Sequence, residues 1–346
     1  MLITTEEYSR VLRGYFFSDC VVRNRNMFTF VMDRWLSDEE AEQWEEEERD
    51  IDFREKRVVP FMRHKEPGKQ WSWTDFKGWD RIVGGAARVP KDQFVGIQSF
   101  GELMVFVTGS GDVGEEPSIP NWRKGGPDRG CADKIKTIDG YAWYCGSGRS
   151  VGQRLGKGHW LAHTQALPSS EDPGDSGTGF RDIDGFGAED VYAVGGKGDV
   201  WHFDGKGWQQ IPFPSNTYLF SVCCGGDGQV YISGYEGLTF VGRGNRWRKI
   251  HDGGSIALPL HDMVWFEDRV WCTNENGVWT IRDGALGYVT DLPTEIAVCA
   301  GHLYVNDGVM LMAGTGGAAF RENGEWHSIV LRGRMERALR EQASGG

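Results

Sequence analysis

A short stretch of this sequence has the residue types of a hydrolytic site. Residues 174–177 spell GDSG, the sequence around a serine-protease nucleophile, and His163 precedes them. A Ser–His–Asp triad is assembled by the fold from distant parts of the chain. Here His163 and Ser176 lie thirteen residues apart in one glycine-rich stretch. We therefore predict no catalytic residues.

Three aspartates could instead hold a metal ion. Asp182, Asp184 and Asp262 fall on short runs expected to be inner strands of repeated units, and carboxylates so placed could bind calcium. Acidic residues near strand ends are also ordinary turn residues, and the sequence contains no H-E-x-x-H motif. We expect no metal and no cofactor. A hydrolase or lyase with a metal in the central channel stays the alternative.

The strongest charged feature is the acidic segment, residues 37–56 (SDEEAEQWEEEERDIDFREK). Its eleven Asp/Glu and three Lys/Arg residues contribute −8 of the formal net charge of −12. Residues 37–40 resemble a capping box, which predicts a short helix. One interpretation is a solvated helix that keeps the protein soluble. The other is a landing surface for a basic partner, with Trp44 as the aromatic anchor. The residues predicted to bind the partner are Glu42, Trp44, Glu45, Glu46, Glu47, Glu48, Asp50 and Asp52.

These residues belong to a chain built on a repeat of about forty residues. From Tyr192, glycines follow at +3, +6 and +13 and aromatic residues at +9 and +16, and the same offsets recur from Tyr231. Weaker copies begin at Phe106, Trp143 and Trp271, and at Leu311. Aromatic residues spaced by 38 to 48 positions close the units: Trp79, Trp122, Trp160, Trp208, Trp247, Tyr288 and Trp326.

Each unit has the pattern of four short strands. Runs such as VYAV, VYIS and RVWC are β-branched or aromatic and too short for helices, and DGKG, GDGQ and ENG mark turns between them. We expect an inner strand first and then three strands that close on the aromatic residue. Seven such units predict an all-β fold, a β-propeller of seven four-stranded blades with a short helical insertion in the first blade, with six or eight blades as the alternatives. The repeated aromatics are then core residues.

Composition agrees with such a fold. The 346 residues include 50 glycines and 43 aromatics, and 39% are hydrophobic, as in soluble globular proteins. No apolar run approaches the ~18 residues of a membrane helix, and the N-terminus lacks the pattern of an export signal. Seven scattered cysteines without a C-x-x-C pair indicate reduced thiols in a cytoplasm. The acidic balance argues against nucleic-acid binding. We expect a cytoplasmic monomer that binds no membrane.

The expected organisation is one propeller domain over residues 1–331, with the acidic segment in its first blade, and a short helix or tail over residues 332–346. Two more insertions interrupt the repeat. Residues 168–179 are flexible by composition, and residues 109–120 stretch a strand connection in the second blade.

The unit at 190–208, DVYAVGGKGDVWHFDGKGW, resembles uncharacterised bacterial propellers that are similar to the propeller-type immunity proteins of interbacterial toxin systems, such as type VI secretion and Rhs effectors. The match is good from about 180 to 330 and looser from 93 to 166. The resemblance implies a cytoplasmic protein that binds and blocks a cognate toxin or effector. The acidic segment adds the expectation that this toxin is a basic, nuclease-like domain. A scaffold for a larger assembly is the other non-catalytic alternative.

Overall fold

The structure is a computed structural model that describes residues 2–168, 179–254 and 256–344. The protease-like sequence at 174–177 lies outside the described residues, as does nearly all of the insertion at 168–179. None of the described helices is long and apolar enough to cross a membrane.

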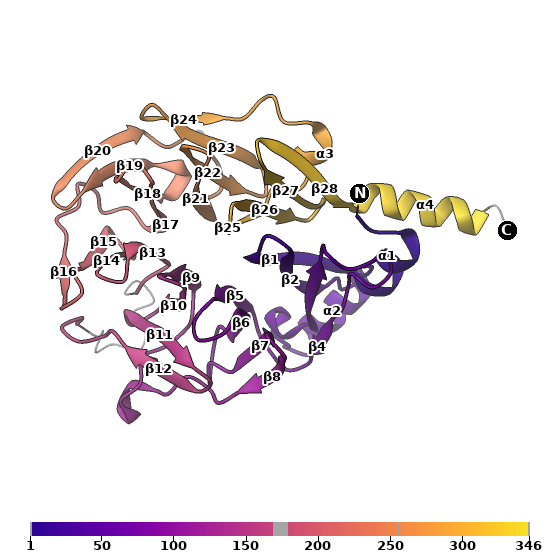
Figure 1. Ribbon diagram of the computed structural model, residues 1–346, viewed down its shortest axis with the longest axis horizontal. Coiled ribbons are helices and arrows are strands. Elements are labelled where there is room, and N and C mark those ends of the chain that lie inside the picture. The colour runs from indigo at the N-terminus through magenta and orange to yellow at the C-terminus, as the bar shows by residue number, and fades with distance from the viewer. Residues whose placement is uncertain (1, 169–178, 255, 345–346) are drawn as a thin grey trace. The chain divides into compact units, whose positions relative to one another are not determined.

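Within the described residues the strands form seven four-stranded antiparallel sheets, each built from four consecutive strands (Figure 1). This is the architecture of a β-propeller with seven blades, so the predicted fold is confirmed. The chain divides into two compact units, residues 1–82 with 290–346 and residues 83–289.

The first unit holds the N-terminal and the C-terminal blade. The N-terminal blade consists of β1 (Tyr15–Asn24), β2 (Met27–Arg34), β3 (Lys56–Met62) and β4 (Thr74–Phe76). The C-terminal blade consists of β25 (His302–Asn306), β26 (Val309–Gly314), β27 (Gly317–Glu322) and β28 (Glu325–Leu331). The helices of this unit are α1 (Thr5–Val11), α2 (Asp38–Glu46), the 3₁₀ turn η1 (Ile51–Phe53), α3 (Thr294–Ala297) and α4 (Arg332–Ser344).

Side chains, and not a shared strand, join these two blades. Each blade takes its four strands from one continuous stretch of chain. The rings of Phe28 and Phe320 pack with centroids 5.4 Å apart. At the surface, the Glu322 carboxylate accepts hydrogen bonds from Arg25 at 2.7 Å and from Arg63 at 2.9 Å. An apolar contact and a charged clamp therefore hold the first and last blades together.

The second unit holds five blades. The first two consist of β5 (Ile82–Ala87), β6 (Gln93–Gln98), β7 (Val105–Gly109) and β8 (Asp112–Glu116), and of β9 (Lys134–Ile138), β10 (Tyr141–Gly146), β11 (Ser150–Gly156) and β12 (His159–Ala162). The next two consist of β13 (Asp182–Gly187), β14 (Asp190–Gly195), β15 (Asp199–Phe203) and β16 (Trp208–Gln210), and of β17 (Leu219–Cys224), β18 (Val230–Gly234), β19 (Thr239–Arg243) and β20 (Arg246–His251). The fifth consists of β21 (Asp262–Phe266), β22 (Arg269–Asn274), β23 (Gly277–Arg282) and β24 (Ala285–Tyr288). The first strands β9, β13, β17 and β21 lie beside one another in that order, so the first strand of each of these four blades is the inner one.

The repeated aromatic residues are core residues in the clearest unit. Tyr192, Trp201 and Trp208 on β14, β15 and β16 are all buried. Trp201 and Trp208 belong to one hydrophobic cluster with Phe180 and Phe203. Blades with this spacing therefore stack through their aromatic side chains, as the repeat predicted.

Two units depart from the prediction that the closing aromatic residues belong to the core. Tyr288 closes its blade on β24 but is 54% exposed. Trp122 does not close the second blade, because it lies in the 3₁₀ turn η2 (Trp122–Lys124) and is 54% exposed. The outer strand is β8, inside the segment 109–120 that was predicted to be an insertion. Ser110 and Gly111, both with positive φ, form a two-residue hairpin turn between β7 and β8. The prediction was wrong because Gly114, Glu115 and Glu116 are weak strand formers.

Candidate partner-binding site

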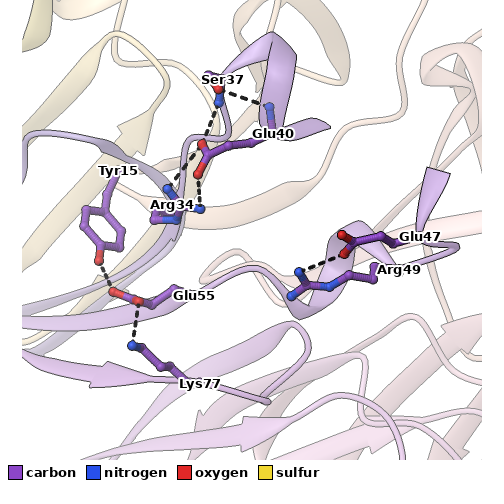
Figure 2. A network of polar contacts seen from close by, with 8 residues as sticks. All are labelled: Tyr15, Arg34, Ser37, Glu40, Glu47, Arg49, Glu55 and Lys77. Carbon is purple, nitrogen blue, oxygen red and sulfur yellow. Dashed lines mark hydrogen bonds and ion pairs between the residues drawn. The ribbon is translucent and has the colours of Figure 1, made fainter. Parts of the chain in front are cut away.

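The acidic segment connects β2 to β3 and contains the predicted short helix. Ser37 caps the start of α2: its hydroxyl accepts a hydrogen bond from the backbone N–H of Glu40 at 3.2 Å. The Glu40 carboxylate accepts one in return from the backbone N–H of Ser37 at 3.0 Å (Figure 2). These two bonds satisfy N–H groups that a helix leaves without partners at its first turn. No residue of α2 is buried, so the helix projects its charged side chains into solvent.

Polar contacts at both ends attach the acidic segment to its blade (Figure 2). Arg34, the last residue of β2, donates to Glu40 at 2.9 Å, and this bond lowers the pKa of the Glu40 carboxyl. At the other end, the Tyr15 hydroxyl donates to Glu55, which lies 3.9 Å from the ammonium of Lys77. Burial and the bond to Glu55 both raise the pKa of Tyr15. The acidic segment is therefore a projection whose two ends are attached to the blade by polar contacts.

The structure places the predicted partner-binding residues along this projection. Glu42, Trp44, Glu45 and Glu46 lie on α2, Glu47 is its C-terminal cap and Glu48 follows, while Asp50 and Asp52 belong to the cap and body of η1. Their seven carboxylate side chains are exposed and Trp44 is half-buried. Two of the carboxylates have local roles. Asp50 accepts from the backbone N–H of Asp52 at 2.9 Å. Glu47 accepts from Gln43 at 2.7 Å and pairs with Arg49 at 3.5 Å.

A hollow lies between α2 and η1. It has a volume of about 560 Å³, and we call it the Trp44 hollow; its lining residues are Asp38, Ala41, Glu42, Trp44, Glu45, Arg49 and Ile51. The guanidinium carbon of Arg49 lies 3.8 Å from the centre of the Trp44 ring. A cation over an indole face at this distance is held by electrostatic attraction to the ring. The sequence indicated the tryptophan as an anchor but not the arginine that covers it.

Exposed apolar side chains flank the acidic helix on both sides, and the sequence prediction did not include them. Trp35 is 39% exposed, Ile51 47% and Phe53 44%. Trp35 packs on Phe16 with ring centroids 4.6 Å apart. Large apolar side chains surrounded by charge are typical of interfaces, where the centre excludes water and the rim stays polar. The sequence could have indicated these three residues, because all of them lie in or next to the most acidic segment of the chain.

The aspartates considered as metal ligands have another role in the structure. Asp182 on β13 accepts a hydrogen bond from the backbone N–H of Val222 on β17 at 2.9 Å. Two residues further along β13, Asp184 accepts one from the backbone N–H of Cys224 at 2.8 Å. Both carboxylates therefore link the inner strands of consecutive blades.

Lysines neutralise the same carboxylates. Lys134 on β9 forms an ion pair with Asp262 on β21. Burial lowers the pKa of Lys136, but the nearby charges of Asp182, Asp184 and Asp262 outweigh it and raise that pKa above its usual range. Burial raises the pKa of Asp182 to about 6, against the opposing effect of Lys136. Among the described residues, no three His, Cys, Asp or Glu side chains are grouped as a metal would require. The three carboxylates therefore bind backbone N–H groups and lysine ammonium groups of the protein itself.

No family model matches the chain. Solved structures with the same fold include YCF48 bound to D1 peptide, with a TM-score of 0.58 and 12% identity, covering 90% of this chain and 93% of that one. The WD40 β-propeller domain of Doa1 has a TM-score of 0.57 at 12% identity, with 89% and 92% covered. Sqt1 of Saccharomyces cerevisiae has a TM-score of 0.55 at 9% identity, with 92% and 85% covered. At such low identity these similarities show the propeller fold alone.

A much stronger similarity is to a curated protein of Pseudomonas aeruginosa, the immune protein Tsi7. The two chains are 33% identical over 237 residues, which is 68% of this chain and 75% of the relative. Identity at this level over two thirds of the chain extends well beyond a single blade of about forty residues, so it cannot come from the repeat pattern of one unit. The seven-bladed chain with its acidic projection belongs to the family of the immune protein Tsi7.

Proposed function

We propose that this protein is a cytoplasmic immunity protein that binds and neutralises a cognate toxin, of the kind delivered by type VI secretion. Its membership in the family of an immune protein supports this role. The observation that carries the site assignment is the anchored acidic projection, in which seven exposed carboxylates lie on the same short segment as Trp44 and the exposed side chains of Ile51 and Phe53.

This surface suits a basic protein partner. The acidic segment carries a formal charge of −8, and all of its residues except Lys56, the first residue of β3, lie on one connection between two strands. Such a concentration of one charge sign attracts a surface of opposite sign and speeds its association. The exposed apolar side chains then supply area that is buried on contact, which slows dissociation. We propose that neutralisation consists of covering the toxin, with no reaction catalysed by this chain.

The test is capture of the partner from the native bacterium, repeated over a salt series from about 50 mM to about 500 mM, which shortens the Debye length several-fold. The expected result is a single stoichiometric protein whose toxicity in a sensitive host is suppressed when this chain is co-expressed. Light scattering is expected to give one copy of each chain in the complex. A partner-free protein, or a partner that is equally toxic with and without this chain, contradicts the proposal.

The geometry of the blade offers a clean deletion for the site assignment. The backbone N–H of Arg34 donates to the carbonyl of Glu55 at 2.9 Å, so the strand ends lie at hairpin distance. Replacing residues 35–54 with Asn-Gly closes β2 and β3 with a two-residue turn. This variant is expected to keep the melting behaviour of the propeller and to lose partner affinity. Unchanged affinity would place the partner elsewhere on the surface.

A further inference from the structure

The Trp44 hollow has the chemistry of a receptor for a basic side chain. Ala41, Trp44 and Ile51 supply apolar lining, and Asp38, Glu42 and Glu45 supply carboxylates. Glu42 and Glu45 are exposed, and neither forms an ion pair within the described part of the chain. Arginine and lysine side chains combine an aliphatic stem with a terminal cation, so they need both kinds of surface at once.

Arg49 shows that a guanidinium fits this place. Its guanidinium carbon lies 3.8 Å from the centre of the Trp44 ring, and one of its nitrogens lies 3.5 Å from the Glu47 carboxylate. About half of the Arg49 side chain is exposed. Because exposed cation–π contacts and exposed ion pairs are each weak, a second cation can compete for the ring at little cost. The Arg49 side chain of the protein itself therefore occupies a place on the Trp44 ring that can hold a cation.

We propose that the Trp44 hollow receives an arginine or lysine side chain of the toxin, which replaces Arg49 on the indole ring and is neutralised by Glu42 and Glu45. This inference rests on the proposed function for the identity of the partner, but the site itself can be tested without the toxin. The effect of removing Arg49 on ligand affinity distinguishes this proposal from a purely structural role of Arg49. If Arg49 competes with the ligand, its removal strengthens binding; if Arg49 supports the site, its removal weakens binding.

The probe is a capped tri-arginine peptide, with capped tri-citrulline as a control of nearly the same shape without charge. Binding to the full chain is followed on the indole N–H resonance of Trp44, which is assigned from its loss in Trp44→Phe. The expected result is a saturable shift with the arginine peptide and none with the citrulline peptide. Glu42→Gln/Glu45→Gln is expected to weaken the binding. Equal shifts with both peptides, or no shift with the arginine peptide, overturn the proposal.

Two arginine variants then show whether removal of Arg49 raises or lowers the affinity for the peptide. Arg49→Ala is expected to bind the arginine peptide about two- to five-fold more tightly than Arg54→Ala, because only the first uncovers the ring. The two variants change the net charge of the acidic segment equally, so Arg54→Ala controls for general electrostatics. Because Arg54 also donates to the carbonyl of Ile51 at 2.9 Å, Arg54→Gln, which keeps a donor, is measured beside it. Equal affinities of the two variants, or weaker binding by Arg49→Ala, overturn the proposal.

Calorimetry with the purified partner separates this inference from the proposed function. With the captured toxin as the probe, Trp44→Ala is expected to weaken binding about five-fold or more, as for a residue at the centre of an interface. If no toxin is captured at all, the proposed function fails while the peptide result still stands on its own. A captured toxin that binds Trp44→Ala as tightly as the unaltered chain overturns the inference and leaves the immunity role intact.

Discussion

The carboxylate of Asp182 on β13 accepts a hydrogen bond from the backbone N–H of Val222 on β17, the inner strand of the next blade, at 2.9 Å. Asp184 repeats this contact with the backbone N–H of Cys224 two residues further along the strand. The sequence offered these two aspartates as candidate metal ligands. In the structure their carboxylates instead join the inner strands of two consecutive blades.

Asp182→Ala is expected to lower the free energy of unfolding by about 1–3 kcal/mol, because it removes the acceptor of a buried N–H. Urea denaturation followed by tryptophan fluorescence measures the change. Asp252→Ala is the matched control: Asp252 is exposed and pairs with the exposed Lys249, so its loss is expected to be nearly neutral. Equal effects of the two substitutions would show that the Val222 contact contributes nothing to stability.

His163 is expected to make the protein less stable in mild acid. Burial lowers its pKa from 6.5 to about 4, so between these values the unfolded chain binds a proton that the folded chain does not. The free energy of unfolding therefore falls as the pH is lowered from about 6.5 to about 4. In His163→Phe, whose ring can still stack on Trp143, this part of the acid sensitivity is expected to disappear. Urea midpoints at four pH values across the window give the slope.

Asp182 has the opposite pH dependence in an overlapping window. Its pKa is raised from 3.8 to about 6, so there the folded chain binds the extra proton and stability increases as the pH falls. Asp182→Asn is therefore expected to show a steeper loss of stability on acidification than the unaltered protein, and His163→Phe a shallower one. Parallel pH profiles for the two variants would contradict both assignments.

Charge on the acidic segment is expected to control the rate of partner association. Neutralising Glu45, Glu46 and Glu48 together as glutamines should slow association at least about ten-fold at low salt, with the difference shrinking as salt rises. Stopped-flow mixing with the purified partner measures the rate. The control removes three exposed carboxylates from the second unit, with Asp252, Asp268 and Asp283 replaced by asparagine. If both triple variants associate equally slowly, net charge and not this surface is responsible.

The exposed apolar side chains are expected to control dissociation. The double substitution Ile51→Ser/Phe53→Ser should weaken partner binding about five-fold or more through faster dissociation, with the melting temperature unchanged because both side chains are exposed. Val113→Ser is the control, since Val113 is 71% exposed on β8 and lies outside the acidic segment. Surface plasmon resonance separates the two rates. An unaffected dissociation rate would exclude these residues from the interface.

Local patterns predicted most of the architecture. The spacing of glycines and aromatics from Tyr192 and Tyr231 defined the blades, because hairpin turns and alternating strands are set by neighbouring residues. The capping box at Ser37 and Glu40 predicted α2 for the same reason. The pattern was wrong at Trp122, where a hairpin of weak strand formers supplied the outer strand of the blade.

The sequence by itself determined the repeat, the propeller built from it, and the acidic, helix-forming insertion, since each depends on residues within a few positions of one another. Only the tertiary structure decided what the candidate site residues face. Asp182 meets Val222 because consecutive inner strands lie side by side, forty residues apart in sequence. Arg49 covers Trp44 because the chain reverses after α2 at Glu48, whose φ of 52° turns the following residues back over the helix. The Asp182 contact does not follow from local propensity, because it depends on where two separately formed segments meet in space. The Arg49 contact spans only five residues, but it requires a positive φ at Glu48, which glutamate rarely adopts.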